Sequence, residues 1–273
     1  MPIFTRPDRS ATLAYETAGE RGPRVLLVQG TGCVGRGWRP QIDGLAGDHR
    51  LAWHDNRGIG GSLPLQGPVS VRTMAEDCLA LLDHLGWERA HLVGHSLGGL
   101  LVQEAARVAP SRIQSLCLMS TLWRGRDAAI PGLQSLWVTI RARFGAERRR
   151  WIALGALPFP RRYLEAIGDD ETYRRMRMIF CEDFLKTPPI VRQQVAALWG
   201  HRGGEAAPLL GIPTLILTGA RDIVVDTRRS DELLGLLPHA RLERFADAGH
   251  GLPLQHPDAV NELVRAHVAA ADP

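Results

Sequence analysis

The sequence predicts an α/β protein with a doubly wound, mostly parallel sheet and an inserted helical cap. Short apolar runs alternate with helical periodicity at both ends of the chain, and this rhythm stops between residues 122 and 207. A Gly-x-Ser-x-Gly motif at residues 94–98 joins an apolar run to an apolar helix. The alternation implies βαβ units, whose parallel strands are covered by helices on both faces.

The predicted elements follow from local patterns. Each strand is a short apolar run bounded by turn residues, and each helix repeats apolar residues at intervals of three and four. The strands are predicted, in chain order, at Ala11–Glu16, Val25–Gln29, Leu51–His54, His91–Gly94, Ile113–Met119, Thr214–Thr218 and Arg241–Phe245. The helices are predicted at Val71–Leu85, Gly99–Val108, Arg228–Leu236 and Pro257–Ala269.

Residues 122–207 contain four tryptophans, several prolines and no convincing strand pattern. Their helical periodicity indicates a cap inserted between two strands of the sheet. The strand pattern resumes near residue 211. We therefore expect residues 1–121 and 208–273 to fold together as one discontinuous core.

Composition limits the partners of the chain. The 273 residues suit one α/β domain with an insertion and are enough to bury a large core. Nearly all of the positive charge comes from arginine, and Lys186 is the only lysine. Arginines are dense between residues 141 and 177, but acidic residues lie among them and no nucleic-acid motif accompanies them. We expect a solvated surface and no nucleic-acid partner.

The first ten residues contain no apolar region of the kind found in signal peptides, and no segment approaches the length of a membrane span. These observations favour a soluble, cytoplasmic protein with no membrane partner. The oligomeric state stays open.

The motif around Ser96 is typical of a nucleophile elbow. Small residues at Gly94 and Gly98 allow the strand and helix to pass closely, so the serine oxygen stands clear near the helix amino terminus. The alternative is an ordinary Gly-rich turn. A serine hydroxyl needs a base to take its proton and a third group to orient that base.

Two downstream loops supply candidates for the base and its partner. Asp222 follows the strand at 214–218, and His250 follows the last strand. Loops after parallel strands share one edge of the sheet, so we expect Ser96, Asp222 and His250 to converge. Asp226 is interpreted as a helix N-cap and Asp247 as a surface turn residue.

Two backbone N–H groups are predicted to form an oxyanion hole. One belongs to Leu97, directly after the serine, and the other to Thr31, in the loop after an early strand. The alternative for that loop is a plain Gly-rich turn.

The same loop matches a dinucleotide fingerprint, Gly-x-Gly-x-x-Gly at residues 30–35, with Asp55 downstream. We expect Gly37 and Pro40 to interrupt the following helix, and Asp55 to form a salt-bridged turn with Arg57. No cofactor is therefore predicted. No metal site is predicted either, since two histidines four apart lie on a strand and its turn rather than on a helix.

The chain resembles the α/β-hydrolase superfamily over nearly its full length. The matching segments lie at residues 29–32, 55–62, 94–99, 219–222 and 249–250. Within that superfamily it is similar to the small esterases, enol-lactonases and cofactor-free haloperoxidases. Many members have His where this chain has Gln29, which implies a different support for the oxyanion loop. A serine nucleophile argues against epoxide hydrolase or dehalogenase chemistry.

The residues and the resemblance together predict a serine hydrolase that cleaves a small, largely apolar carboxylic ester. A lactonase, an enol-lactonase or a C–C bond hydrolase of the same fold is the alternative. A slow-turnover ligand sensor that retains the triad, and a nicotinamide enzyme, are alternatives of other classes. Trp38, Trp123 and Trp137 are predicted to contact the substrate, unless they only pack the cap against the core.

Overall fold

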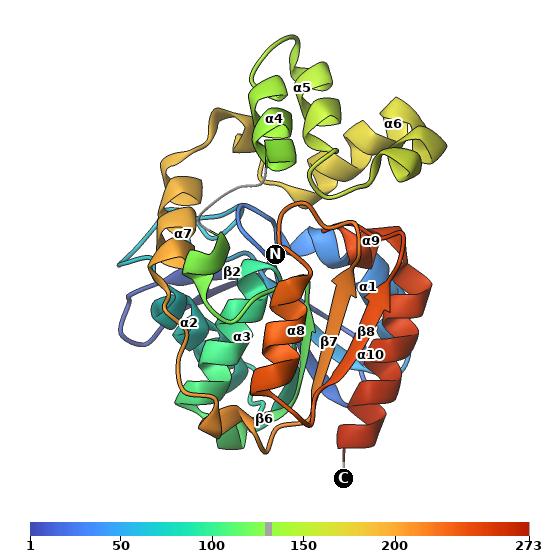
Figure 1. Ribbon diagram of the computed structural model, residues 1–273. Coiled ribbons are helices and arrows are strands. Elements are labelled where there is room, and N and C mark those ends of the chain that lie inside the picture. Colours follow the sequence, from blue (N-terminus) through green and yellow to red (C-terminus); the bar gives the residue numbers. More distant parts are fainter. Residues whose placement is uncertain (129–132, 273) are drawn as a thin grey trace.

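The computed structural model describes residues 1–128 and 133–272, and its main body is a sheet with helices on both faces (Figure 1). Within these residues the sheet has eight strands in the order β1-β2-β4-β3-β5-β6-β7-β8. The pairs β1–β2 and β2–β4 are antiparallel, and all pairs from β4 to β8 along this order are parallel. The strands are β1 (Ile3–Thr5), β2 (Thr12–Ala18), β3 (Arg24–Val28), β4 (Arg50–His54), β5 (Ala90–His95), β6 (Ile113–Met119), β7 (Thr214–Gly219) and β8 (Arg241–Phe245).

Side chains of the parallel strands alternate between two buried faces. Val25 and Leu27 of β3 belong to one apolar cluster, whereas Leu26 and Val28 belong to the other. The first face is covered by α1 (Arg39–Leu45), α9 (Leu252–Gln255) and α10 (Pro257–Ala271). The second is covered by α2 (Val71–His84), α3 (Leu97–Val108) and α8 (Arg228–Leu236). This arrangement confirms the predicted doubly wound α/β class.

All seven predicted strands are present, with boundaries that differ by a few residues. The edge strand β1 was not predicted, because three residues are too few for a periodic pattern. No α-helix follows the Gly-rich loop directly, as expected at Gly37, but the expectation that Pro40 interrupts the helix is wrong. A 3₁₀ turn, η1 (Gly35–Trp38), accommodates Gly37, and α1 begins with Pro40 in its first turn, where a missing N–H breaks no helical bond.

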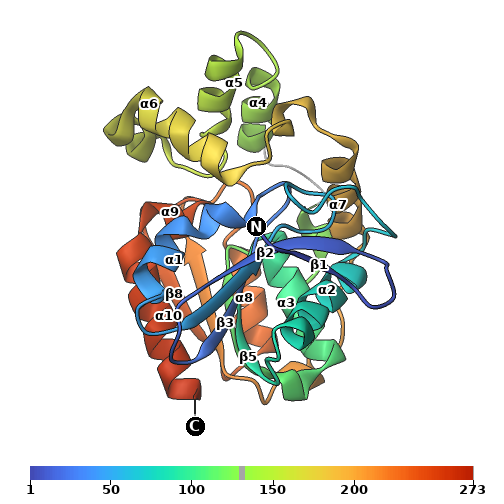
Figure 2. The same cartoon turned by 180° about the vertical axis from the view of Figure 1, so that it is seen from behind.

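The described residues between β6 and β7 form helices joined by loops. Figures 1 and 2 show α4, α5 and α6 as a layer over one end of the sheet. Trp151, Leu154 and Met176 give this layer a small core of its own. The elements are η3 (Gly125–Ala128), α4 (Leu133–Arg141), α5 (Glu147–Leu154), α6 (Arg161–Ile179), η4 (Phe184–Lys186), α7 (Pro189–Gly200) and η5 (Ala207–Leu209). The predicted cap, residues 122–207, lies wholly between β6 and β7, and its division from the core stays a prediction.

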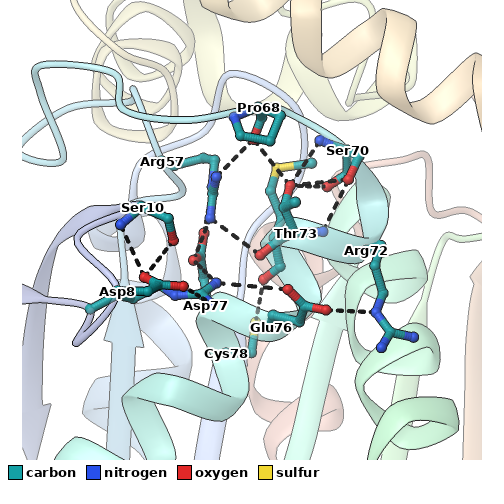
Figure 3. A network of polar contacts seen from close by, with 12 residues as sticks. Asp8, Ser10, Arg57, Pro68, Ser70, Arg72, Thr73, Glu76, Asp77 and Cys78 are labelled. Carbon is teal, nitrogen blue, oxygen red and sulfur yellow. Dashed lines mark hydrogen bonds and ion pairs between the residues drawn. The ribbon is translucent and has the colours of Figure 1, made fainter.

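A buried ion pair joins the loop after β4 to α2 (Figure 3). Arg57 donates to both carboxylate oxygens of Asp77, at 2.7 and 2.6 Å, and both side chains are buried. The expected salt bridge between Asp55 and Arg57 is wrong. Asp55 instead accepts the backbone N–H groups of Gly35 and Gly61, at 2.6 and 2.8 Å. Its carboxylate thereby joins the loop after β3 to the loop after β4.

Candidate active site

Ser96 occupies a strained turn between β5 and α3. Its backbone has φ 55° and ψ −119°, a conformation that L-residues rarely adopt. A Cβ on Gly94 would lie 2.4 Å from the Gly98 carbonyl oxygen, and one on Gly98 would lie 2.1 Å from the Val28 oxygen. Both positions therefore require glycine. Thr121 also holds the turn, because its hydroxyl donates to the Ser96 carbonyl at 2.7 Å.

Asp222 and His250 meet in the loops after β7 and β8. The Nδ1 atom of His250 lies 2.8 Å from Oδ2 of Asp222. The other carboxylate oxygen, Oδ1, accepts the N–H groups of Val224 and Val225 at 2.8 and 2.9 Å. Since an ionised carboxylate can only accept, the Nδ1 atom carries the proton and the Nε2 atom keeps its lone pair. Asp222 thus holds one tautomer of His250.

Ser96 and His250 line one cavity of about 350 Å³ beneath the helices that follow β6. Their side chains share no hydrogen bond in the part of the chain that the structure describes. Such contacts often tighten only when a substrate is bound. The cavity wall is otherwise mainly apolar and includes Leu157, Ile179, Phe180, Val191, Leu198 and Leu254.

The two predicted oxyanion donors lie beside Ser96. Leu97 is the first residue of α3, so its N–H has no partner within the helix. Thr31 lines the cavity, in a loop that packs closely on the serine: a Cβ on Gly30 would lie 3.0 Å from Ser96 Cβ. Within residues 1–128 and 133–272, neither N–H group is hydrogen-bonded. Both are free to donate to a ligand.

His95 is a cavity residue whose role was not predicted from the sequence. Its Nε2 lies 2.8 Å from the carbonyl oxygen of His250, and its ring centroid lies 4.8 Å from that of His250. Burial, followed by the neighbouring His250, lowers the pKa of His95 to about 3. A neutral imidazole therefore donates its Nε2 proton to the backbone that carries His250. Its position before the serine in the motif was the available signal.

The alternative acids of the sequence do not contact His250. Asp226 binds Arg228, whose side-chain and backbone hydrogen bonds lower the pKa of Asp226 to about 2. Asp226 lies next to the N-cap position of α8, which Thr227 occupies. Asp247 lies 3.0 Å from the ring of His256. Of these three acids, the structure brings only Asp222 to His250.

The three tryptophans predicted to contact substrate do not line the described part of the cavity. Trp38 is buried, with its ring edge-on to His95 at 6.4 Å. Trp123 is buried beneath the guanidinium of Arg107, 4.4 Å from its ring centroid. Trp137 faces solvent on α4, 66% exposed. The tryptophan that does line the cavity is Trp199 of α7.

In the described residues, no group of three or more His, Cys, Asp or Glu side chains is arranged to hold a metal ion. Over the same ranges, no helix has the length and apolarity needed to cross a membrane.

The Gly-rich loop at residues 30–35 does not offer all of its amides to a ligand, because Gly32 N–H is bound to Gln194 and Gly35 N–H to Asp55.

The model of the alpha/beta hydrolase fold matches residues 23–257. The "Putative carbamate hydrolase RutD" of Azorhizobium caulinodans is 29% identical over 266 residues, which cover 93% of this chain and 94% of that protein. The "Putative non-heme bromoperoxidase BpoC" of Mycobacterium tuberculosis is 30% identical over 259 residues, covering 91% of this chain and 94% of that protein.

Among solved structures, the enol-lactonase of Burkholderia xenovorans LB400 is similar in fold. It has a TM-score of 0.81 at 24% identity, covering 98% of this chain and 100% of that chain. At this identity the likeness concerns the fold alone.

Proposed function

The chain belongs to the alpha/beta hydrolase fold family, and on that premise we propose that it is a serine hydrolase of small, uncharged, apolar carboxylic esters. The supporting observation is the 2.8 Å contact between Asp222 and His250 at a cavity that Ser96 also lines. This set supplies a nucleophile, a base and a group that orients the base.

In the proposed reaction, Ser96 Oγ attacks the ester carbonyl carbon while the Nε2 atom of His250 takes the hydroxyl proton. The carbonyl electron pair moves to the oxygen, which receives hydrogen bonds from Thr31 and Leu97 N–H. His250 then gives its proton to the leaving alcohol, and an acyl-serine remains. Water repeats the sequence and releases the acid.

The lining of the cavity supports an uncharged substrate. No Arg, Lys, Asp or Glu is among the described residues that line it. A carboxylate or ammonium on the substrate would lose its hydration there without gaining an ionic partner, which is costly. The volume of the cavity, about 350 Å³, is near the lower end of the range for ligand pockets and suits a short acyl chain.

Ser96→Ala tests the proposal, with turnover of p-nitrophenyl acetate, butyrate, octanoate and laurate as the measurement. We expect the wild type to prefer the shorter chains and Ser96→Ala to lose activity. Ser120→Ala is the matched control, because this buried serine follows the neighbouring strand and lies outside the described cavity lining. Full turnover by Ser96→Ala would refute the proposal.

A carbamate or lactone substrate is the second candidate, favoured by the names of a carbamate hydrolase and an enol-lactonase among the similar proteins. The same catalytic set would attack either carbonyl. Neutral carbamates and lactones of matched size, tested beside the esters, distinguish the candidates by kcat/KM.

A further inference from the structure

The oxyanion loop is a tight turn whose geometry depends on one glycine. Cys33 N–H donates to the Gly30 carbonyl at 3.2 Å, which closes a four-residue turn over Thr31 and Gly32. Gly32 has φ +67°, as the third residue of a type II turn requires. In a trans peptide the N–H points opposite to the C=O, so the bond to Cys33 also directs Thr31 N–H away from Cys33.

Both backbone polar groups of Gly32 are held by the helical segment between β6 and β7. Its N–H donates to Oε1 of Gln194 on α7 at 2.8 Å, and its carbonyl accepts from Cys181 N–H at 3.1 Å. The ring of Phe184 covers the same residue, because a Cβ on Gly32 would lie 2.4 Å from it. A segment more than 140 residues further along the chain therefore holds this turn.

Gln194 has no second partner that would explain its burial. Its side chain is fully buried, and its Nε2 has no hydrogen-bond partner among the described residues. An unpaired buried amide destabilises a fold. Among the described residues, the hydrogen bond that this amide makes is the one to Gly32 N–H in the turn. Burying Gln194 therefore fixes the turn at a cost in stability.

We propose that Gln194 is a positioning residue that holds the Thr31–Gly32 peptide and thereby keeps the backbone of Thr31 in place, while the bond between Cys33 and Gly30 sets the direction of the Thr31 N–H toward the oxyanion. Without an acceptor for Gly32 N–H, this peptide can rotate toward a type I turn, because glycine accepts either sign of φ. This rotation exchanges the directions of the Thr31 carbonyl and the Gly32 N–H, and it shifts the Thr31 backbone that carries the oxyanion donor. The inference rests on the serine hydrolase function proposed above.

The test is Gln194→Leu, with Gln193→Leu as the matched control. Gln193 is the preceding residue of α7 and is exposed, so it undergoes the same chemical change away from the turn. We expect Gln194→Leu to lower kcat for p-nitrophenyl butyrate by about 10- to 100-fold, since losing an oxyanion donor outright costs about 10²–10³. KM should change by less than about threefold, because ground-state binding is retained.

A pair of ketones separates positioning from general damage. A trifluoromethyl ketone adds to the serine oxygen and forms a tetrahedral oxyanion, whereas the methyl ketone of the same chain binds unchanged. Gln194→Leu should weaken the first inhibitor in parallel with kcat/KM and leave the second unaffected. Equal weakening of both, or an unchanged kcat, would overturn the proposal.

Hydrogen exchange tests the hydrogen bond between Gly32 N–H and Gln194 without relying on turnover. The amide of Gly32 should exchange faster in Gln194→Leu than in the wild type and in Gln193→Leu. Gln194→Glu keeps an acceptor oxygen for Gly32 N–H, so the exchange of this amide should stay slow. The carboxylate of this variant should lower kcat increasingly as the pH rises. Unchanged exchange in Gln194→Leu refutes the inference. Absence of any Ser96-dependent turnover by the wild type refutes the proposed function instead.

Discussion

Asp222→Asn is expected to place the proton of His250 on the wrong nitrogen. The N–H groups of Val224 and Val225 donate to Oδ1, so the oxygen of an asparagine must occupy that side. Its NH₂ group then takes the place of Oδ2, which lies 2.8 Å from Nδ1 of His250 in the wild type. A donor at this position requires Nδ1 as an acceptor, which moves the ring proton to Nε2 and removes the base.

The expected loss is about 10⁴-fold in kcat, equivalent to about 5 kcal/mol of barrier, by analogy with a serine protease whose triad aspartate was changed in the same way. The assay is hydrolysis of p-nitrophenyl butyrate, with urea unfolding to show that the variant is folded. Asp226→Asn is the matched control, since this acid binds Arg228 and should be dispensable. Retention of more than about a tenth of the wild-type kcat/KM by Asp222→Asn would refute the reasoning.

Three further outcomes concern stability, each measured by urea unfolding. Gly98→Ala should destabilise the fold and lower activity, because the new Cβ would lie 2.1 Å from the backbone oxygen of Val28. Gly235→Ala is the control: a Cβ there meets no atom within 4 Å, so it should stabilise α8 by about 0.5–1 kcal/mol. Asp77→Asn should cost about 3–5 kcal/mol because it leaves the buried guanidinium of Arg57 uncompensated. The exposed Asp8→Asn is the control and should cost much less, because water screens its ion pair with Arg6. Burial lowers the pKa of His91 to about 4, so near pH 6 the unfolded chain binds a proton at this residue and the folded chain does not. The free energy of unfolding therefore falls as the pH drops from 7 to 4. His91→Asn should reduce this fall by about 2–3 kcal/mol. A pH slope that is unchanged in His91→Asn would contradict this assignment.

The placement of Ser96, Asp222 and His250 at one edge of the sheet could be predicted from the sequence, because each residue is marked by a local pattern. Ser96, Asp222 and His250 each follow a short apolar run, and the ends of parallel strands share one edge. No long-range information was needed to expect them together. Their catalytic roles stay a proposal for the assays above.

The features that were missed depend on contacts between distant segments. Gln194 lies on a helix with no motif, and its partner Gly32 is 162 residues away. The partner of Arg57 could not be chosen from spacing, because Asp55 was nearer in sequence than Asp77. Likewise, the aromatic character of Trp137 does not say which side of α4 it occupies.

The single lysine of the chain offers a handle on the contact between η4 and the Gly-rich turn. Lys186 is exposed and ends η4, two residues after the Phe184 ring that covers Gly32. An amine-directed fluorophore would attach there and at the terminal amine alone. The unmutated protein can thus be given a reporter two residues from this contact. A change in its emission during turnover would show whether η4 separates from the turn.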